Sequence, residues 1–276
     1  MIQNIGIYIV ATNKYNNLLL DLFESINATL HTTRDFKITI NLATDQVEQN
    51  KNLSKKFELI LFNFLEIDNY GWPEATLFRY KFIKCFDNVF NFDYCMYLDA
   101  DMKIHCEFLS ENVFLNDQNK ITLVKHPAYN IDKSLNGIWN AITSPSIILK
   151  YIKSIKFAFF KIGAWETNKK SMAYVPYLKR STYVHGAIWF GHPIPFDKLC
   201  TELDSRTDID FMNGVIASWH DESHLNWYAC HKSVNYLGSS YSWVKGYRHL
   251  KHVKPAISSL SVIDKRLKLS SSAIQK

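Results

Sequence analysis

Two acidic motifs carry the residue types that chemistry on a phosphorylated substrate would need. Asp99 and Asp101 are separated by one residue and directly follow the apolar run 94–98. At the end of a buried strand, two such carboxylates can hold a hard divalent cation such as Mn²⁺ or Mg²⁺, which shares its oxygen ligands with substrate phosphates. The cation would neutralise a diphosphate without a glycine-rich loop. The alternative is a strand-end turn in which an aspartate caps the next segment.

The second motif is the segment 219–226, which reads Trp-His-Asp-Glu-Ser-His-Leu-Asn. Glu222 lies between two histidines, where a buried carboxylate could act as a nucleophile, as a base or as an electrostatic stabiliser of a cation. His220 and His224 are four residues apart and could share a helical face as zinc ligands. Their spacing differs from H-E-x-x-H, because Glu222 does not follow the first histidine directly. A polar helix start with acidic residues in its first turn is the structural alternative.

Composition and charge limit the classes of protein. The chain has 276 residues, of which 47% are hydrophobic and 21% charged, and this excludes a disordered or collagen-like chain. Its net charge of +6 suits anionic partners without requiring nucleic acid. The five cysteines form no C-x-x-C pair, and no apolar run reaches the roughly 20 residues that span a bilayer. We therefore expect a cytoplasmic protein, soluble or peripheral at the inner membrane face, that does not bind nucleic acid.

Apolar periodicity predicts the elements that must position the two motifs. We expect strands at residues 5–10, 36–42, 58–64 and 94–98, and helices at residues 16–30 and 76–86. This alternation is typical of a Rossmann-type α/β sheet, whose ligands bind at the carboxyl ends of the strands. Neither G-x-G-x-x-G nor a G-K-[ST] phosphate loop occurs, so the phosphates of a nucleotide would need another partner. We expect one domain in two halves that meet near residue 110.

The segment 219–226 resembles the signature of glycosyltransferase family 6, which includes the ABO blood-group transferases, the α-1,3-galactosyltransferases and bacterial relatives. Shorter matches follow the family order at residues 5–7, 11, 14–15, 44–45, 71–79, 99–101, 126–127, 173–176 and 185–188. The resemblance implies a GT-A fold, with a Rossmann-like half at about 1–110 that binds the nucleotide-sugar, a mixed sheet, and an acceptor and catalytic half at about 111–276. It also implies retaining transfer of galactose or N-acetylgalactosamine from a UDP-sugar to a galactose-terminated, blood-group-like acceptor in α-1,3 linkage.

Carried over residue by residue, the resemblance assigns roles. Glu222 would be the catalytic carboxylate beside the acceptor, and Asp99 and Asp101 would bind Mn²⁺ or Mg²⁺ together with the donor. The other residues expected at the donor are Ala11, Tyr15, Arg79, Ala100, His185, Gly186, Ala187, His220, Asp221 and Lys265, and those expected at the acceptor are His126 and Trp219. Ala187 favours UDP-galactose, an effect on the order of 1–3 kcal/mol. Retention could proceed through a glycosyl–Glu222 intermediate or a same-face ion pair, and the sequence leaves both open.

Two basic segments suggest a membrane-associated acceptor. Residues 145–162 read as an amphipathic helix, with Ser144 as N-cap, Ile and Phe on one face and Lys on the other. Such a helix could lie on an anionic membrane or pack on the protein with solvated lysines. A second basic cluster lies between residues 245 and 276. Our hypothesis is that both clusters bring the enzyme to a lipid-linked glycan at the inner leaflet.

Two other functions remain as alternatives. One is a zinc metallohydrolase with His220 and His224 as ligands, and the other is a glycan-binding module that has lost catalysis. The Asp-x-Asp pair and the missing H-E-x-x-H weigh against the hydrolase. Glu222 weighs against the binding module, because binding alone does not need that carboxylate.

Overall fold

A computed structural model describes residues 3–32, 36–105, 118–129, 161–245, 250, 254–260, 265 and 268–269. The predicted boundary near residue 110 lies outside these residues, as does the predicted helix at 145–162 apart from its last two positions. Within the described residues, no helix is long and apolar enough to cross a membrane.

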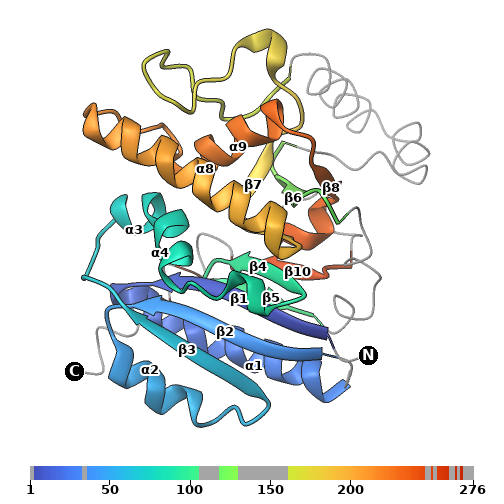
Figure 1. Ribbon diagram of the computed structural model, residues 1–276. Coiled ribbons are helices and arrows are strands. Elements are labelled where there is room, and N and C mark those ends of the chain that lie inside the picture. The colour runs from blue at the N-terminus through green and yellow to red at the C-terminus, as the bar shows by residue number, and fades with distance from the viewer. Residues whose placement is uncertain are drawn as a thin grey trace.

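The described residues form an α/β structure with two sheets (Figure 1). The strands are β1 (Gln3–Ala11), β2 (Phe36–Thr44), β3 (Ile60–Glu66), β4 (Tyr94–Leu98), β5 (Met102–Ile104), β6 (Thr122–Lys125), β7 (Val184–Gly191), β8 (Asn235–Leu237), β9 (Trp243–Val244) and β10 (Ile257–Ser259). The α-helices are α1 (Leu19–Thr32), α2 (Val47–Ser54), α3 (Glu74–Leu77), α4 (Arg79–Cys85), α8 (Pro193–Met212) and α9 (His220–His231). Short 3₁₀ helices are η1 (Asn13–Leu18), η2 (Val89–Asn91), η4 (Tyr177–Lys179) and η5 (Ser239–Ser242).

The larger sheet is mixed and has the strand order β3-β2-β1-β4-β7-β6-β8. β1 pairs in parallel with both β2 and β4, whereas β7 is antiparallel to β4 and to β6. The smaller sheet has the order β5-β10-β9 and joins the chain after β4 to its C-terminal part. The larger sheet therefore continues from the predicted nucleotide half into the predicted catalytic half.

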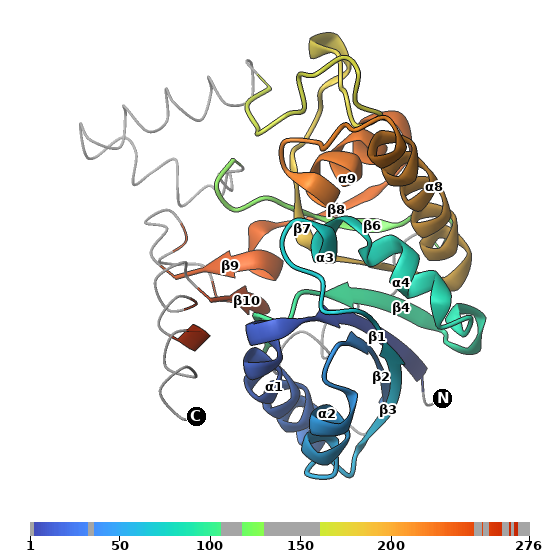
Figure 2. The same cartoon turned by 90° about the vertical axis from the view of Figure 1, so that its left-hand side faces the viewer.

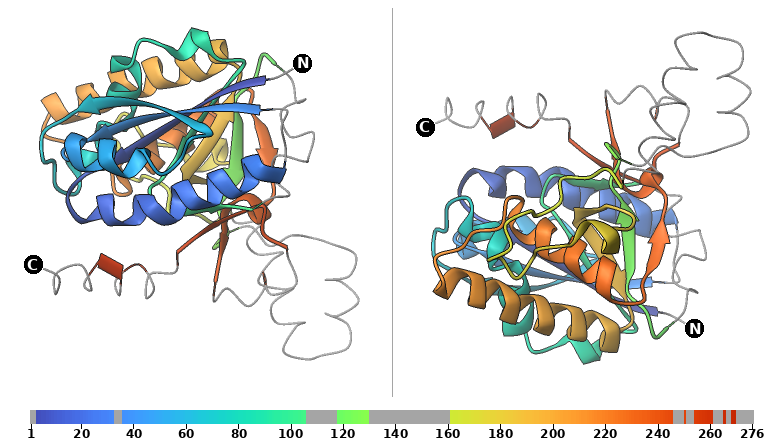
Figure 3. Two further views of the ribbon diagram at one scale, coloured as in Figure 1. Left: turned by 90° about the horizontal axis from the view of Figure 1, so that it is seen from below. Right: turned by 90° about the horizontal axis from the view of Figure 1, so that it is seen from above.

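Side-chain alternation along β1 produces a core on each face of the sheet. Ile5, Ile7 and Ile9 face a cluster that includes Phe23 of α1, and Tyr8 points to the other face and stacks on Phe196 of α8, with 5.5 Å between ring centroids. In Figures 1 and 2, α1 and α2 accordingly cover one face while α4 and α8 cover the other. The views from below and above in Figure 3 place the same helices on opposite sides.

Two predicted helices differ from the observed ones in their first turns. The helix expected at 16–30 begins as the 3₁₀ helix η1, because Asn16 turns its side chain toward the end of β2. Its Oδ1 accepts hydrogen bonds from Thr44 Oγ1 and Asn50 Nδ2, both at 2.7 Å, and its Nδ2 donates to Asp45 Oδ1 at 2.9 Å. The helix expected at 76–86 is divided at Phe78 into α3 and α4.

The strand order determines where a ligand can bind. From β1 the chain continues through α1 to β2 on one side, while β4 lies on the other side of β1. The segments that leave β1 and β4 diverge at such a switch point, and the carboxyl ends of the two strands open a crevice between them. The predicted motif at Asp99 follows β4 at this point.

Candidate active site

A cleft of about 480 Å³ opens at the carboxyl ends of β1 and β4. Its walls come from the turn after β1, the turn after β4, the segment before α3, the start of α4 and the C-terminal segment. The lining residues are Val10, Thr12, Asn13, Lys14, Tyr15, Tyr70, Gly71, Trp72, Ala75, Thr76, Arg79, Tyr97, Asp99, Ala100, Asp101, Lys265 and Leu269. Six predicted donor-site residues, from segments far apart in the sequence, thus line one cleft.

Both carboxylates of the Asp-x-Asp motif lie at this cleft, each beside a cation. Asp99 Oδ1 accepts a hydrogen bond from Tyr97 OH at 2.8 Å and lies 3.1 Å from a guanidinium nitrogen of Arg79. Asp101 Oδ2 lies 2.8 Å from Lys265 Nζ. Burial raises the pKa of Asp101, although the Lys265 ammonium acts in the opposite direction.

Arg79, the first residue of α4, joins the cleft to the start of α9. Its Nη1 lies 3.1 Å from Asp99 Oδ1 and 3.0 Å from Asp221 Oδ2, and it donates to the carbonyl oxygen of Gly186 at 2.9 Å. Its guanidinium also stacks on the Tyr97 ring. Burial disfavours the charged form, but the neighbouring acidic groups, Asp221 first, outweigh it and raise the pKa of Arg79. The guanidinium is therefore a fixed positive charge between two carboxylates.

Glu222 is held by donors on both of its oxygens. Oε1 accepts from Tyr183 OH and Oε2 from the Gly186 amide, each at 2.8 Å. Burial raises the pKa of Glu222 to about 7, against the opposing effect of these two hydrogen bonds. Burial likewise raises the pKa of Asp221 to about 8, although Arg79 opposes the shift. Two adjacent carboxyl groups thus titrate near neutral pH.

Gly186 is required by the close approach of β7 to α9. A Cβ atom at this position would lie 2.9 Å from the Glu222 Cβ and 3.0 Å from Asp221 Oδ2. Any side chain would push both carboxylates away from β7. The glycine thus allows its own amide to reach Glu222 Oε2.

His126 and His185 lie beside Glu222. The three residues bring potential ligand atoms within 4.8 Å of one another, and by residue type such a group could hold a metal ion. Burial lowers the pKa of His126 to about 2 and that of His185 to about 4, so both rings are neutral. His126 Nδ1 accepts the Ala128 amide at 3.1 Å, so the neutral ring carries its proton on Nε2. This tautomer makes His126 a hydrogen-bond donor, as a sugar-binding residue would need to be.

The remaining predicted residues lie at different depths. Tyr15 lines the cleft with Lys265 Nζ 4.8 Å from its ring centroid, whereas Ala11 is buried in the core below. Ala187 is also buried, and its carbonyl oxygen accepts the Asp99 amide at 3.0 Å. His220 meets the exposed Trp72 ring edge-on at 4.4 Å. Trp219 is 55% exposed and does not line the cleft.

Sequence reasoning missed two tyrosines and gave no role to a tryptophan of the cleft. Tyr97 is two residues before Asp99, so the alternation of β4, continued by one residue past its end, would have placed both side chains on one face. Trp72 falls in a matched segment, and its place in the cleft wall follows from the fold. Tyr183 has no local signal, since its contact with Glu222 joins residues 39 positions apart.

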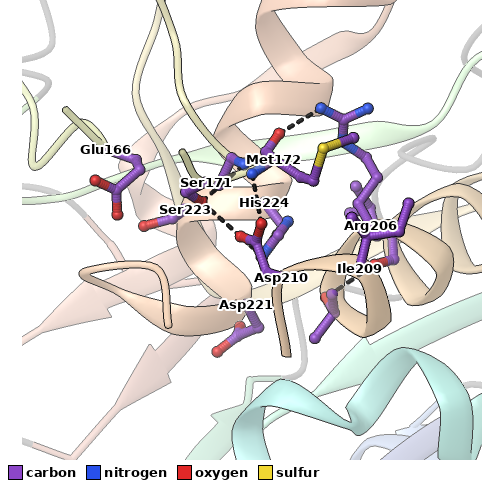
Figure 4. Close-up of polar contacts among 12 residues, drawn as sticks. Glu166, Ser171, Met172, Arg206, Ile209, Asp210, Asp221, Ser223 and His224 are labelled. Carbon is purple, nitrogen blue, oxygen red and sulfur yellow. Dashed lines mark hydrogen bonds and ion pairs between the residues drawn. The ribbon is translucent and has the colours of Figure 1, made fainter. Parts of the chain in front are cut away.

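His220 and His224 do not form a zinc site. His224 is fully buried beside Asp210 of α8, with 3.5 Å between Nε2 and Oδ2 (Figure 4), while His220 packs on Trp72. Burial lowers the pKa of His224 to about 3, with Arg206 adding to the shift. Among the residues that the structure describes, the one metal-like group contains neither histidine.

Comparison with known proteins adds independent evidence. The family model of glycosyltransferase family 6 matches residues 143–264, which include the motif at 219–226. The O-antigen biosynthesis glycosyltransferase WbnI of Escherichia coli is 25% identical over 191 residues, or 69% of each chain. The histo-blood group ABO system transferase 2 of Rattus norvegicus is 35% identical over 80 residues, or 29% of this chain and 24% of that one. The globoside α-1,3-N-acetylgalactosaminyltransferase 1 of Gallus gallus is 23% identical over 252 residues, or 87% of this chain and 61% of that one.

The chain is similar to glycosyltransferase family 6. The predicted family is thereby confirmed, and so is the predicted GT-A type α/β fold, because the described residues form a large mixed sheet with helices on both faces. The comparisons support a transferase that moves a glycosyl group from a sugar donor to a glycan acceptor. Its metal, its sugar and the roles of its individual site residues remain predictions.

Proposed function

We propose that this family 6 enzyme is a metal-dependent, retaining transferase that moves galactose from UDP-galactose to a galactose-terminated acceptor in α-1,3 linkage. One observation carries the proposal. Arg79 Nη1 contacts Asp99 at 3.1 Å and Asp221 at 3.0 Å, so a single guanidinium connects the Asp-x-Asp cleft with the helix turn that bears Glu222. A donor whose diphosphate lies at one end of this contact can present its sugar at the other.

The cleft fits a nucleotide diphosphate and a divalent cation. Asp99 and Asp101 provide carboxylate oxygens, the donor type that hard cations prefer, and both residues line the cleft. Asp99 Oδ1 is engaged by Arg79 and Tyr97, so Oδ2 is its remaining oxygen for a metal. Mn²⁺ or Mg²⁺ bound here would neutralise charge on the leaving diphosphate. Arg79 and Lys265 add two fixed positive charges on the same side.

Glu222 is the group that we assign to the sugar. When the sugar–phosphate bond breaks, the electron pair leaves with UDP and positive charge develops on the sugar ring. The partly buried carboxylate of Glu222 stabilises that charge, either as a nucleophile or as the partner of a same-face ion pair. Its two hydrogen bonds, to Tyr183 and Gly186, fix its orientation before the donor binds. His126 then donates to an acceptor hydroxyl beside it.

Ala187 and the names of the relatives indicate the donor and acceptor sugars. Ala187 is the predicted determinant of galactose over N-acetylgalactosamine, and its backbone lies next to Asp99. The names of the relatives include an O-antigen glycosyltransferase and a globoside N-acetylgalactosaminyltransferase, which favours a surface glycan or a lipid-linked glycan as acceptor. Peripheral contact with an anionic membrane stays a prediction, because most of the basic residues behind it lie outside the described part of the chain.

The decisive experiment measures UDP release with Mn²⁺ from UDP-galactose and from UDP-N-acetylgalactosamine, with galactose and fucosyl-galactose acceptors, before and after chelation. We expect release that prefers UDP-galactose and stops with chelator, and an α-1,3 product by NMR. Glu222→Gln should lower kcat by roughly a thousandfold, the scale of a lost electrostatic stabiliser, and leave UDP affinity nearly unchanged. Release that persists in chelator would contradict metal dependence. No release with either donor would favour a glycan-binding module.

A further inference from the structure

A buried carboxylate lies outside the cleft, in the loop that precedes η4. Glu166 is 2% exposed, and its two oxygens each accept one backbone amide at 2.6 Å, Oε1 from Asn168 and Oε2 from Ser218. Among the residues that the structure describes, no cation pairs with it. Burying a carboxylate without a cation is unfavourable for folding. Glu166 therefore costs stability at this position, and its two hydrogen bonds indicate the role that it serves there.

Glu166 fixes the backbone just before the predicted catalytic turn. Ser218 is followed by Trp219 and then by His220, whose φ of 46° is in the left-handed region that a residue with a side chain rarely adopts. Such a conformation persists only when the surrounding structure over-determines it. The Glu166–Ser218 bond lies on one side of this residue, and on the other Tyr80 OH donates to the Asp221 carbonyl oxygen at 3.0 Å.

The same loop also reaches Glu222 by a second route. Tyr183 OH lies 3.2 Å from the carbonyl oxygen of Ala164 and 2.8 Å from Glu222 Oε1. Trp165 packs edge-on against the Tyr183 ring, with 5.0 Å between centroids. Residues 164–166 are therefore connected both to the Glu222 side chain, through Tyr183, and to the Glu222 backbone, through Ser218 and the turn at His220.

From these contacts we propose that Glu166 is a positioning residue for the Asp221–Glu222 turn. It accepts the Ser218 amide, holds the strained backbone at His220, and so keeps Glu222 oriented toward the donor sugar. Its effect on turnover rests on the proposed function, whereas its effect on the backbone does not. Glu166 itself does not contact the cleft.

Asp210 of α8 provides a matched contrast, because it binds residues of the same loop. Its carboxylate is also 2% exposed and accepts two hydrogen bonds at 2.6 Å, from the Met172 amide and from Ser171 Oγ. Figure 4 shows Asp210 between Ser171 and His224, apart from Glu166. One of its partners is a hydroxyl that can rotate and accept, so an asparagine can keep both contacts. Both partners of Glu166 are amides that can only donate, so a glutamine must leave one unsatisfied.

The test compares Glu166→Gln with Asp210→Asn, since both replace a buried carboxylate by an amide of the same size. For Glu166→Gln we expect kcat to fall roughly tenfold or more, the scale of a misplaced catalytic group, with the Kd for UDP in Mn²⁺ unchanged within twofold. For Asp210→Asn we expect kcat within twofold of wild type. Glu166→Asp keeps both acceptor oxygens and should recover part of the lost kcat.

Hydrogen exchange of the Ser218 amide reports on the backbone without any turnover. We expect it to accelerate at least tenfold in Glu166→Gln and to stay unchanged in Asp210→Asn, even if the wild-type enzyme transfers no sugar from a UDP-sugar. Equal kcat values for the two variants, a parallel loss of UDP affinity, or an unchanged Ser218 exchange rate would each overturn the proposal. If Glu166→Gln does not fold, Glu166→Asp carries the test, and wild-type kcat and exchange in that variant would overturn it.

Discussion

The two pairs of acidic residues that Arg79 connects are built in opposite ways. Asp99 and Asp101 follow a strand, line an open cleft and lie beside cations, with 30% of the Asp99 side chain exposed. Asp221 and Glu222 lie in the first turn of a helix, Asp221 buried and Glu222 partly buried, and have pKa values raised to about 8 and about 7. The first pair offers carboxylate oxygens to a cation at the cleft. In the second pair, desolvation raises both pKa values toward neutral pH, against the opposing effects of Arg79 and of the hydrogen bonds to Glu222.

The difference between the two pairs matches the two kinds of charge that glycosyl transfer develops, one on the leaving diphosphate and one on the sugar. A leaving diphosphate needs positive charge around it, and in the proposed function Arg79 and Lys265, beside the Asp-x-Asp motif, supply this charge. A sugar with oxocarbenium character needs negative charge, and in the proposed function Glu222 supplies this on the other side of Arg79. The Arg79 guanidinium lies between the two pairs and contacts one carboxylate of each. Its removal should therefore disturb both pairs at once.

Arg79→Met should produce the largest effect. It removes the partner of two carboxylates and leaves Asp221 buried without its cation, so we expect a loss of about 3–5 kcal/mol in the free energy of unfolding. Denaturant unfolding measures this loss. Lys84→Met is the matched control, because Lys84 lies on the same helix but forms one partly exposed ion pair, with Asp204 at 2.9 Å. The control should lose less than about 1 kcal/mol. Equal losses in the two variants would contradict a central role for Arg79.

Tyr183→Phe should change the pH dependence by an intermediate amount. In the proposed function turnover requires ionised Glu222, whose pKa is about 7, so kcat/KM should rise with pH through 7. The Tyr183 hydrogen bond favours the carboxylate and lowers that pKa, so its removal should move the rising limb to higher pH by about one unit. Tyr97→Phe removes an equivalent hydroxyl from Asp99 and should leave the midpoint in place. A shift toward lower pH in Tyr183→Phe would contradict the assignment of Glu222.

The same contrast explains how much of the site the sequence could predict. The Asp-x-Asp motif depends on local information, because an apolar strand and its exit place Asp99 and Asp101 at the ligand edge. Strand β4 lies where the apolar run predicted it, at Tyr94–Leu98. The environment of Glu222 depends on residues far away in the chain, such as Tyr183, and no periodicity reports such contacts. The motif at 219–226 identified Glu222 only because it resembles a family.

The start of a helix can also depend on distant residues that the local sequence does not reveal. The apolar spacing of α1 was visible in the sequence, but its first turn was not, because Asn16 forms buried hydrogen bonds with Thr44 and Asn50. Polar side chains that bind distant backbone or side-chain groups compete with local helix formation. Glu166 is another case, since a lone glutamate in a loop gives no sign that it accepts the amide of a residue 52 positions away.

Lys265→Met should produce the smallest effect, and it tests whether Asp101 at the cleft binds the divalent cation. The Lys265 ammonium lies 2.8 Å from Asp101 Oδ2, which is also a predicted ligand oxygen for the divalent cation. Both cations compete for one carboxylate, and they repel each other. Mn²⁺ added alone, followed by electron paramagnetic resonance, should therefore bind about threefold more tightly to the variant, a change of about 0.6 kcal/mol.

Lys268→Met is the control for this measurement, because Lys268 is on the same segment but pairs with Asp21 of α1 instead. It removes the same charge from the chain without freeing Asp101, so its Mn²⁺ affinity should equal that of the wild type. Equal tightening in both variants would mean that only the overall charge of the segment matters. Weaker binding in Lys265→Met would mean that the metal does not use Asp101. Tighter Mn²⁺ binding in Lys265→Met alone would mean that Lys265 pairs with Asp101 until the divalent cation binds. The Lys265 ammonium would then be available to the diphosphate on the same wall of the cleft.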